Sequence, residues 1–287
     1  MAAWLLELVF YVALAFPSVR RKLADLAPAV CALALTLSAP LSYLLYAPAT
    51  GCFQATAPVV IVITAAAVCF WYVMLPRRRL TDLGFLAFVA AVAIVKLWRT
   101  VYARPLEGLP MEALGHLMWI RLGILSALVL RRVEGVGFGW WPTAREWSIG
   151  TRQFLLFVPP GAALGWLTGF AQWDPKPLAG MADIARLAAT FLGMLWVVAL
   201  SEEFFFRGLL QGWLTEWLAD ARRALLLSSA LFGLAHLPFR GFPNWRFALL
   251  AAVAGYFYGR AFQQAGGIRA AMVAHAFTNT LWRWLLV

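Results

Sequence analysis

Long runs of apolar residues dominate the chain, and short polar or charged segments separate them. Most runs are about 16 to 20 residues long, close to the ~20 residues that an α-helix needs to cross a bilayer. The continuous apolar run at 61–74 lacks the alternation that a barrel strand requires. Since only helices and closed barrels satisfy all backbone groups in lipid, the pattern predicts an all-α fold, a polytopic transmembrane helical bundle.

The pattern predicts about ten spans. They are expected near 2–17, 26–45, 57–75, 83–98, 113–130, 153–171, 185–206, 222–238, 246–265 and 267–286. Proline has no backbone N–H and interrupts a helix. Pro159-Pro160-Gly161 is therefore expected to break the sixth span, and Pro40 to kink the second.

Composition and charge agree with a multi-pass integral membrane protein in contact with the lipid bilayer. Of the 287 residues, 63% are hydrophobic and only 13% are charged, against about 25% charged in a soluble domain. The net charge is +11, but the basic residues are scattered through connecting segments and form no stripe for nucleic acid. Basic clusters at 20–22, 77–79 and 131–132 predict that these segments face the cytoplasm and both termini the outside. The alanine-rich, arginine-over-lysine composition is typical of a bacterial protein, so the bacterial cytoplasmic (inner) membrane is the expected location.

The most polar interruption divides the chain into sections. Residues 1–132 form an accessory N-terminal section of about five spans, residues 133–152 a cytoplasmic linker, and residues 153–287 a C-terminal core. Helices of the core carry small residues four positions apart, a spacing that lets membrane helices approach closely. The pairs are Gly208/Gly212, Ser229/Gly233 and Gly255/Gly259.

Two adjacent glutamates are the most informative polar feature. Glu202 and Glu203 end a stretch, 187–201, that contains no charged residue. A carboxylate at a bilayer centre costs about 2.5 kcal/mol or more, so it usually pairs, lines a wet cavity or does chemistry. On a helix Glu203 and Arg207 are four residues apart and can form an ion pair, which leaves Glu202 free, about 100° away.

Two further segments carry polar side chains at helical spacing. Phe232 and His236 share one helix face, and His275 and Asn279 share another. If the chain turns near 218–221, Glu202 and His236 each lie about 16 residues from the turn, so an antiparallel helix hairpin brings them side by side. Taken singly, each segment could simply pack or hydrogen-bond a neighbouring helix.

Two carboxylates, two imidazoles, an amide and a guanidinium in one apolar site suit hydrolysis of an amide bond. A carboxylate can take a proton from water, and histidine can orient that water or protonate the leaving nitrogen. No GxSxG, HExxH or convincing serine or cysteine nucleophile occurs. Zinc stays open as an alternative cofactor, because Glu202, His236 and His275 could supply three ligands with water as the fourth; a reaction without cofactor is the first expectation.

The motifs resemble those of a known family. Glu202-Glu203-x3-Arg207, Phe232-x3-His236 and His275-x3-Asn279, in this order over roughly 150–287, are similar to the motifs of the CPBP intramembrane proteases. That family includes the type II CAAX prenyl endopeptidases and abortive-infection or bacteriocin-immunity relatives.

The resemblance implies a glutamic-type intramembrane endopeptidase in which Glu202 activates water and His236 assists. It implies that Glu203 and Arg207 support the site, and that His275 and Asn279 stabilise the oxyanion. The expected substrate is a membrane-associated protein or peptide, cut near its membrane-proximal or C-terminal tail, with a prenylated CAAX end or a sorting tail. Two other functions stay open: a non-proteolytic immunity or scaffold protein whose polar cluster locks helices, and a proton-coupled transporter.

Overall fold

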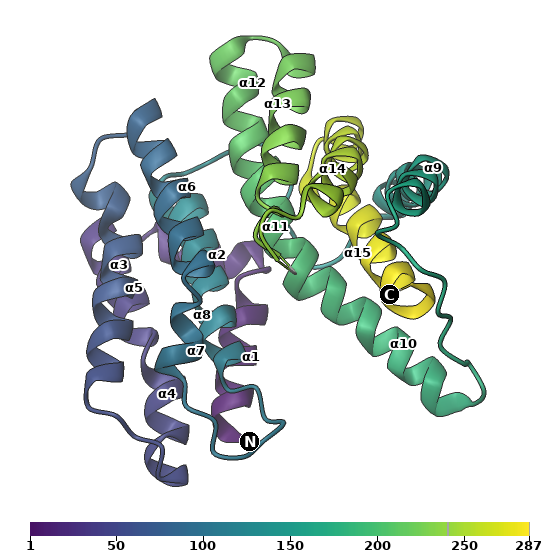
Figure 1. Cartoon of the computed structure of the whole chain (residues 1–287). Coiled ribbons are helices and arrows are strands. Elements are labelled where there is room, and N and C mark those ends of the chain that lie inside the picture. The colour runs from purple at the N-terminus through teal and green to yellow at the C-terminus, as the bar shows by residue number, and fades with distance from the viewer. Residues whose placement is uncertain (240, 287) are drawn as a thin grey trace. The chain divides into compact units, whose positions relative to one another are not determined.

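The computed structural model describes residues 1–239 and 241–286, and this part consists of helices, their connecting loops and one isolated β-bridge between Trp173 and Leu286. Two compact units are present, 1–134 and 135–287, and each is described by itself (Figure 1). The all-α prediction is confirmed.

The first unit consists of short and medium helices. Its elements are α1 (Ala2–Ala13), α2 (Pro17–Ala24), α3 (Pro28–Ser38), α4 (Leu41–Tyr46), η1 (Pro48–Thr50), α5 (Thr56–Met74), α6 (Arg79–Ile94), α7 (Leu97–Val101), α8 (Glu112–Leu125) and the π-helical η2 (Ser126–Leu130). Pro40 lies between α3 and α4, so the interruption expected there is confirmed.

A buried ion pair ties the ends of the first unit together. Arg121 Nε of α8 lies 3.1 Å from Glu7 Oε1 of α1, and both side chains are almost fully buried. Ser42 donates to the other oxygen of Glu7 at 2.6 Å, and Arg121 donates to Ser38 at 2.8 Å. A buried carboxylate needs such partners, because leaving it unpaired in an apolar interior is strongly unfavourable.

The second unit contains the long helices that position the candidate site. Its elements are α9 (Ala144–Leu167), α10 (Met181–Gly193), η3 (Met194–Ala199), α11 (Leu200–Glu203), η4 (Phe204–Gln211), α12 (Gly212–Leu218), α13 (Ala221–Leu234), α14 (Trp245–Ala265) and α15 (Ile268–Leu285). The segments α10 to α12 form one continuous helical stretch, 181–218 (green in Figure 1). It turns at 219–220 into α13, whose start is capped by Asp220 accepting from two backbone amides.

Glycines allow the helices of this unit to approach closely. A Cβ added at Gly233 would lie 2.5 Å from the carbonyl oxygen of Ala248 in α14, and one at Gly255 would lie 3.1 Å from Arg207 Nη2. Close contact at these positions is what the small-residue spacing predicted. Gly212 differs, because its nearest atom would be the carbonyl oxygen of Arg207 at an ordinary 3.8 Å.

The expected linker, 133–152, includes the start of α9. Thr143 and Glu146 form a reciprocal cap at that start, and Arg269 of α15 donates to Glu146 at 3.0 Å. The amide of Ile268 donates to the carbonyl of Val136 at 2.9 Å. These contacts attach the segment to the second unit, while the predicted domain boundaries stay predictions.

The number of spans is not confirmed at ten. Among the described residues four stretches are long and apolar enough to cross a membrane, or five if the bent pair α1–α2 forms one span. The four stretches are Pro28–Thr50, Thr56–Met74, Glu112–Leu130 and Met181–Leu218. Helices occur at the remaining predicted places, but α13 has only 14 residues. The first span, expected to reach residue 17, ends as α1 at Ala13, and the chain bends by 84° into α2.

The break expected at Pro159-Pro160-Gly161 is wrong. The helix α9 continues through both prolines to Leu167. Both prolines are exposed, whereas Gly161 is buried, and a Cβ there would overlap the ring of Phe157. Packing of the buried face, which contacts α14 and α15, offsets the hydrogen bonds that the prolines remove.

Candidate active site

A deformation of the long helix surrounds the two glutamates. Glu202 and Glu203 lie in the short α-helical segment α11, and π-helical turns precede and follow it as η3 and η4. π-Turns are rare and occur frequently at functional sites. They rotate side chains away from the regular α-helical register. The local backbone therefore sets where these carboxylates point.

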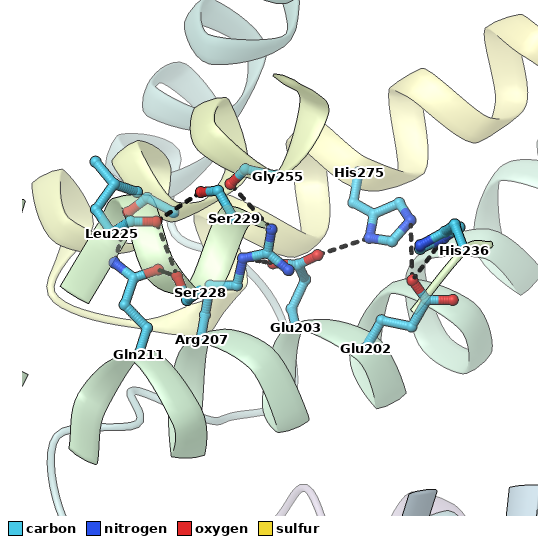
Figure 2. Close-up of polar contacts among 11 residues, drawn as sticks. Glu202, Glu203, Arg207, Gln211, Leu225, Ser228, Ser229, His236, Gly255 and His275 are labelled. Atoms are coloured by element: carbon cyan, nitrogen blue, oxygen red, sulfur yellow. Dashed lines mark hydrogen bonds and ion pairs between the residues drawn. The ribbon is translucent and has the colours of Figure 1, made fainter. Parts of the chain in front are cut away.

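Glu203 is held inside the protein by two partners. Arg207 Nε lies 3.1 Å from Glu203 Oε2, and both side chains are fully buried. His275 Nδ1 lies 2.7 Å from Glu203 Oε1 (Figure 2). Arg207 also donates to the carbonyl oxygen of Gly255 at 2.9 Å. The ion pair expected from the spacing of four is present, so Glu203 is neutralised within the protein.

Glu202 points to the two histidines instead. Its Oε2 atom lies 4.0 Å from His236 Nε2 and 3.9 Å from His275 Nε2. This oxygen is buried and has no hydrogen-bond partner among the described residues, although the side chain as a whole is one third exposed. Figure 2 shows the carboxylate and both imidazole rings turned toward one another. Three polar atoms from α11, from the turn just after α13 and from α15 thus converge.

The Nδ1 atoms of both histidines are engaged elsewhere. His236 Nδ1 lies 2.7 Å from the carbonyl oxygen of Phe232, one turn earlier. A carbonyl and an ionised carboxylate can only accept, so Nδ1 carries the hydrogen in both rings. The Nε2 atoms, which face Glu202, then present a lone pair whenever the ring is neutral.

Asn279 is the one candidate that the structure does not join to this network. It lies four residues after His275 on α15 and is partly buried. Within the described chain its side chain makes no hydrogen bond. It therefore has unused donors next to the site.

The comparisons match this part of the chain. The family model for the type II CAAX prenyl endopeptidase Rce1-like proteins matches residues 184–281. The match covers about a third of the chain, and it makes residues 184–281 (the CPBP segment) similar to the CPBP/CAAX protease family. All six candidate residues lie inside the match. No curated protein and no solved structure matched the chain.

The family is a peptidase family, and its members are membrane proteases that act on membrane-associated protein substrates. The CPBP segment includes the whole long helical stretch from residue 184, together with α13 and α14 and most of α15. The integral membrane character expected from the apolar runs agrees with this family and with the apolar helices.

The CPBP segment contains supporting residues that the sequence did not single out. Tyr258 is fully buried and stacks on His275 with ring centroids 4.6 Å apart. Gln211 continues the Glu203–Arg207 stripe by another four residues, and its amide donates to the carbonyl of Gly259 at 3.3 Å. That regular spacing was the signal that could have identified Gln211, whereas Tyr258 had no comparable signal.

A zinc ion does not fit the side chains as they are arranged. Two ligands of a tetrahedral zinc ion at about 2.0–2.1 Å are about 3.4 Å apart. The two Nε2 atoms lie 3.9 and 4.0 Å from Glu202 Oε2. Over the described residues, no set of three or more His, Cys, Asp and Glu side chains is arranged to hold a metal. The zinc-assisted reaction stays an untested alternative from the sequence, and the mechanism below uses the protein's own side chains alone.

The same separations suit a water molecule. Two hydrogen bonds of about 2.8 Å that meet at about 90° span about 4.0 Å between their partners. One water beside Glu202 Oε2 can therefore reach either imidazole. A water has two hydrogens to donate, whereas Glu202 Oε2 and the two Nε2 atoms are three acceptors. All three can bond to the water when one imidazole is protonated at Nε2 and donates to the water oxygen. The arrangement can hold both a water and a transferable proton.

Proposed function

We propose that this protein is an intramembrane endopeptidase that hydrolyses a peptide bond with a water activated by Glu202. The observation that carries the proposal is the convergence of Glu202 Oε2 with the Nε2 atoms of His236 and His275 within 4.0 Å. The peptidase family of residues 184–281 supports the same reaction class.

In the proposed first step, the water attacks the carbonyl carbon of the substrate peptide bond. Its proton passes to the carboxylate of Glu202, and its oxygen forms the new C–O bond. General-base catalysis of this kind typically contributes about 10²–10⁴-fold in rate. His236, whose ring is oriented by its hydrogen bond to the Phe232 carbonyl, holds the water in line with Glu202.

The negative charge that forms on the carbonyl oxygen needs hydrogen-bond donors. His275 can donate from Nε2 when its ring also carries the Nδ1 proton, and the neighbouring carboxylates of Glu202 and Glu203 supply the counter-charge. Asn279 has an amide with no partner among the described residues and lies one turn away on α15. Loss of one such donor typically costs about 2.7–4 kcal/mol of barrier.

The second step breaks the C–N bond. The electron pair of that bond goes to the leaving nitrogen, which takes the proton that Glu202 accepted in the first step, either directly or relayed through Nε2 of His236. The tetrahedral oxygen then returns to a carbonyl, and the products are a carboxylic acid and an amine. Glu203 and Arg207 touch no reacting atom in this scheme; they position His275 through the 2.7 Å hydrogen bond to its ring.

The proposed substrate is a membrane-associated protein cut near its membrane-proximal segment or C-terminal tail. A prenylated CAAX end and a sorting tail are the two tail types to be separated by experiment, and a bacterial cytoplasmic membrane is the proposed location. The alternative is a non-proteolytic immunity or scaffold protein. The observation that favours the alternative is the fully buried Glu203–Arg207 pair. Its further hydrogen bonds, with His275 of α15 and the Gly255 carbonyl of α14, join helices.

The test is a comparison of membrane proteomes from cells that express the wild type, Glu202→Ala or Glu216→Ala. Glu216 is the matched control, because it is an exposed glutamate on the same long helical stretch. The proposal predicts uncut precursors of one or more membrane proteins in the Glu202→Ala cells alone, with normal amounts of the variant protein. Identical proteomes in all three strains would contradict a peptidase. A Glu202→Ala protein that is lost from the membrane would instead support the structural alternative.

A further inference from the structure

A second polar cavity lies in the first unit, separate from the candidate active site. It is partly enclosed, with a volume of about 150 Å³. Eleven residues line it: Leu23, Ala24, Leu26, Pro28, Cys31, Tyr72, Val73, Arg77, Val129, Leu130 and Arg132. Since a water molecule takes about 30 Å³ of liquid volume, the cavity has room for a phosphate-sized group.

The chemistry of the lining favours an anion. Two of the lining residues, Arg77 and Arg132, are basic, and no acidic residue occurs among the described residues that line the cavity. The nearby carboxylate of Asp82 is already neutralised, because Arg131 contacts it through two nitrogens at 2.9 and 3.0 Å. The charge that faces the cavity is therefore positive, and no acidic side chain in its lining balances it.

The polar lining residues differ in what already holds them. Arg77 donates one hydrogen bond to the carbonyl of Leu130 at 3.0 Å, which fixes its guanidinium against the wall. Tyr72 is buried, and its hydroxyl lies within reach of the Asp82 carboxylate. Because that carboxylate can accept from the hydroxyl, the two arginines alone are counted as donors to a ligand.

Arg132 is held in an unusual backbone conformation. Its φ of +59° lies in the left-handed region, which residues other than glycine seldom adopt. Such strain persists where the surrounding structure imposes it, and it is concentrated at ligand and functional sites. Here it coincides with a guanidinium on the cavity wall.

The apolar half of the lining points to a lipid as the source of the anion. Leu23, Leu26, Val73 and Val129 share the cavity with the two arginines, as expected for a group whose polar head continues into hydrocarbon. The basic clusters at 20–22, 77–79 and 131–132 contribute to this end of the unit. Basic pockets between transmembrane helices on the positive-inside face bind anionic lipid headgroups.

We propose that this cavity binds the phosphate of an anionic membrane phospholipid, with Arg77 and Arg132 as donors and the leucine and valine side chains against the lipid stem. The site is independent of the proposed peptidase reaction, so failure of one proposal leaves the other standing.

The experiment is a lipid titration of the full-length protein in neutral detergent, with bound lipid counted by native mass spectrometry. Phosphatidylglycerol should bind at least about tenfold more tightly than phosphatidylcholine. The double variant Arg77→Gln/Arg132→Gln should lose that preference, because each charge-assisted contact accounts for about tenfold or more in affinity. Equal binding of both lipids to the wild type would overturn the proposal.

Matched variants separate this site from general attraction to a basic surface. Arg21→Gln/Lys22→Gln removes the same charge from exposed residues that do not line the cavity, and it should keep the preference. Arg132→Gln alone leaves the Arg77 hydrogen bond to Leu130 intact and should weaken phosphatidylglycerol binding even if the double variant misfolds. An equal loss in the Arg21/Lys22 variant would contradict a defined site. Thermal protection by inorganic phosphate as strong as that by phosphatidylglycerol would show that the ligand is a soluble phosphate and that the lipid assignment is wrong.

Discussion

Removing Arg207 tests whether the buried pair beside the active site holds the core together. The variant is Arg207→Met, which keeps a long side chain and deletes the charge. It removes the 3.1 Å contact with Glu203, the 2.9 Å hydrogen bond to the Gly255 carbonyl and the cation–π contact with Phe232. Glu203, which is fully buried, then keeps the His275 ring as its hydrogen-bond partner among the described residues.

The expected loss is large. Breaking a buried ion pair from one side costs about 3–5 kcal/mol, because the other charge stays buried without compensation. For a chain of about this size, each kcal/mol of lost unfolding free energy lowers the melting temperature by about 2–4 °C. The melting temperature should therefore fall by about 6–20 °C. The double variant Glu203→Gln/Arg207→Met removes both charges and should melt above Arg207→Met, since no uncompensated charge remains.

The assay is thermal unfolding in detergent, followed by tryptophan fluorescence, for the wild type, both single variants and the double variant. Arg223→Met is the control, because this exposed arginine forms an ion pair at the surface and such pairs contribute little. It should melt close to the wild type. If Arg207→Met melts like Arg223→Met, or if the losses of the two single variants simply add in the double variant, the reasoning about the buried pair is wrong.

Three further predictions concern other parts of the fold. Gly233→Ala should destabilise the protein by about 1–3 kcal/mol, because the added Cβ would lie 2.5 Å from a backbone carbonyl oxygen of α14. Gly193→Ala is the control, because no atom lies within 4 Å of its added Cβ. In the same unfolding assay it should be neutral or stabilise the protein by up to about 1 kcal/mol. Arg131→Gln should cost about 1–3 kcal/mol by leaving its buried aspartate partner without a cation; an unchanged melting temperature would refute this. Hydrogen bonds from the backbone amide of Arg223 and its neighbour hold the pKa of Asp220 below its usual value, so this cap stabilises above the ordinary aspartate pKa and is lost as the pH falls through the lower folded value. Below that pH, backbone amides at the start of α13 should exchange hydrogen faster relative to amides in the middle of the helix. If the ratio of these two exchange rates does not change with pH, Asp220 is not the cap.

Much of the candidate site was predictable because it depends on short-range helix geometry. The spacing of four placed Arg207 against Glu203, and the same geometry left Glu202 on another face. Counting residues from the turn at 218–221 brought Glu202 and His236 together, as the 4.0 Å separation confirms. These inferences need only the rise and period of a helix and the position of one turn.

Other features depend on packing, which spacing does not reveal. The exposed prolines of α9 do not break it, because contacts of the opposite face hold the helix together. The π-turns around Glu202 change the local register without any sequence signal. Tyr258 stacks on His275 only because α14 and α15 lie side by side. The count of about ten spans is not confirmed, because several of the expected segments form helices shorter than the ~20 residues that a span needs.

The central claim is that Glu202 activates the hydrolytic water. The direct test is the single-turnover cleavage rate of Glu202→Gln, measured in the purified protein on a substrate identified from the proteomes, beside Glu216→Gln as the matched control. The account predicts a rate about 10²–10⁴-fold below the wild type, with an unchanged melting temperature and with the control at the wild-type rate. A Glu202→Gln protein that cleaves within a few-fold of the wild type would contradict it.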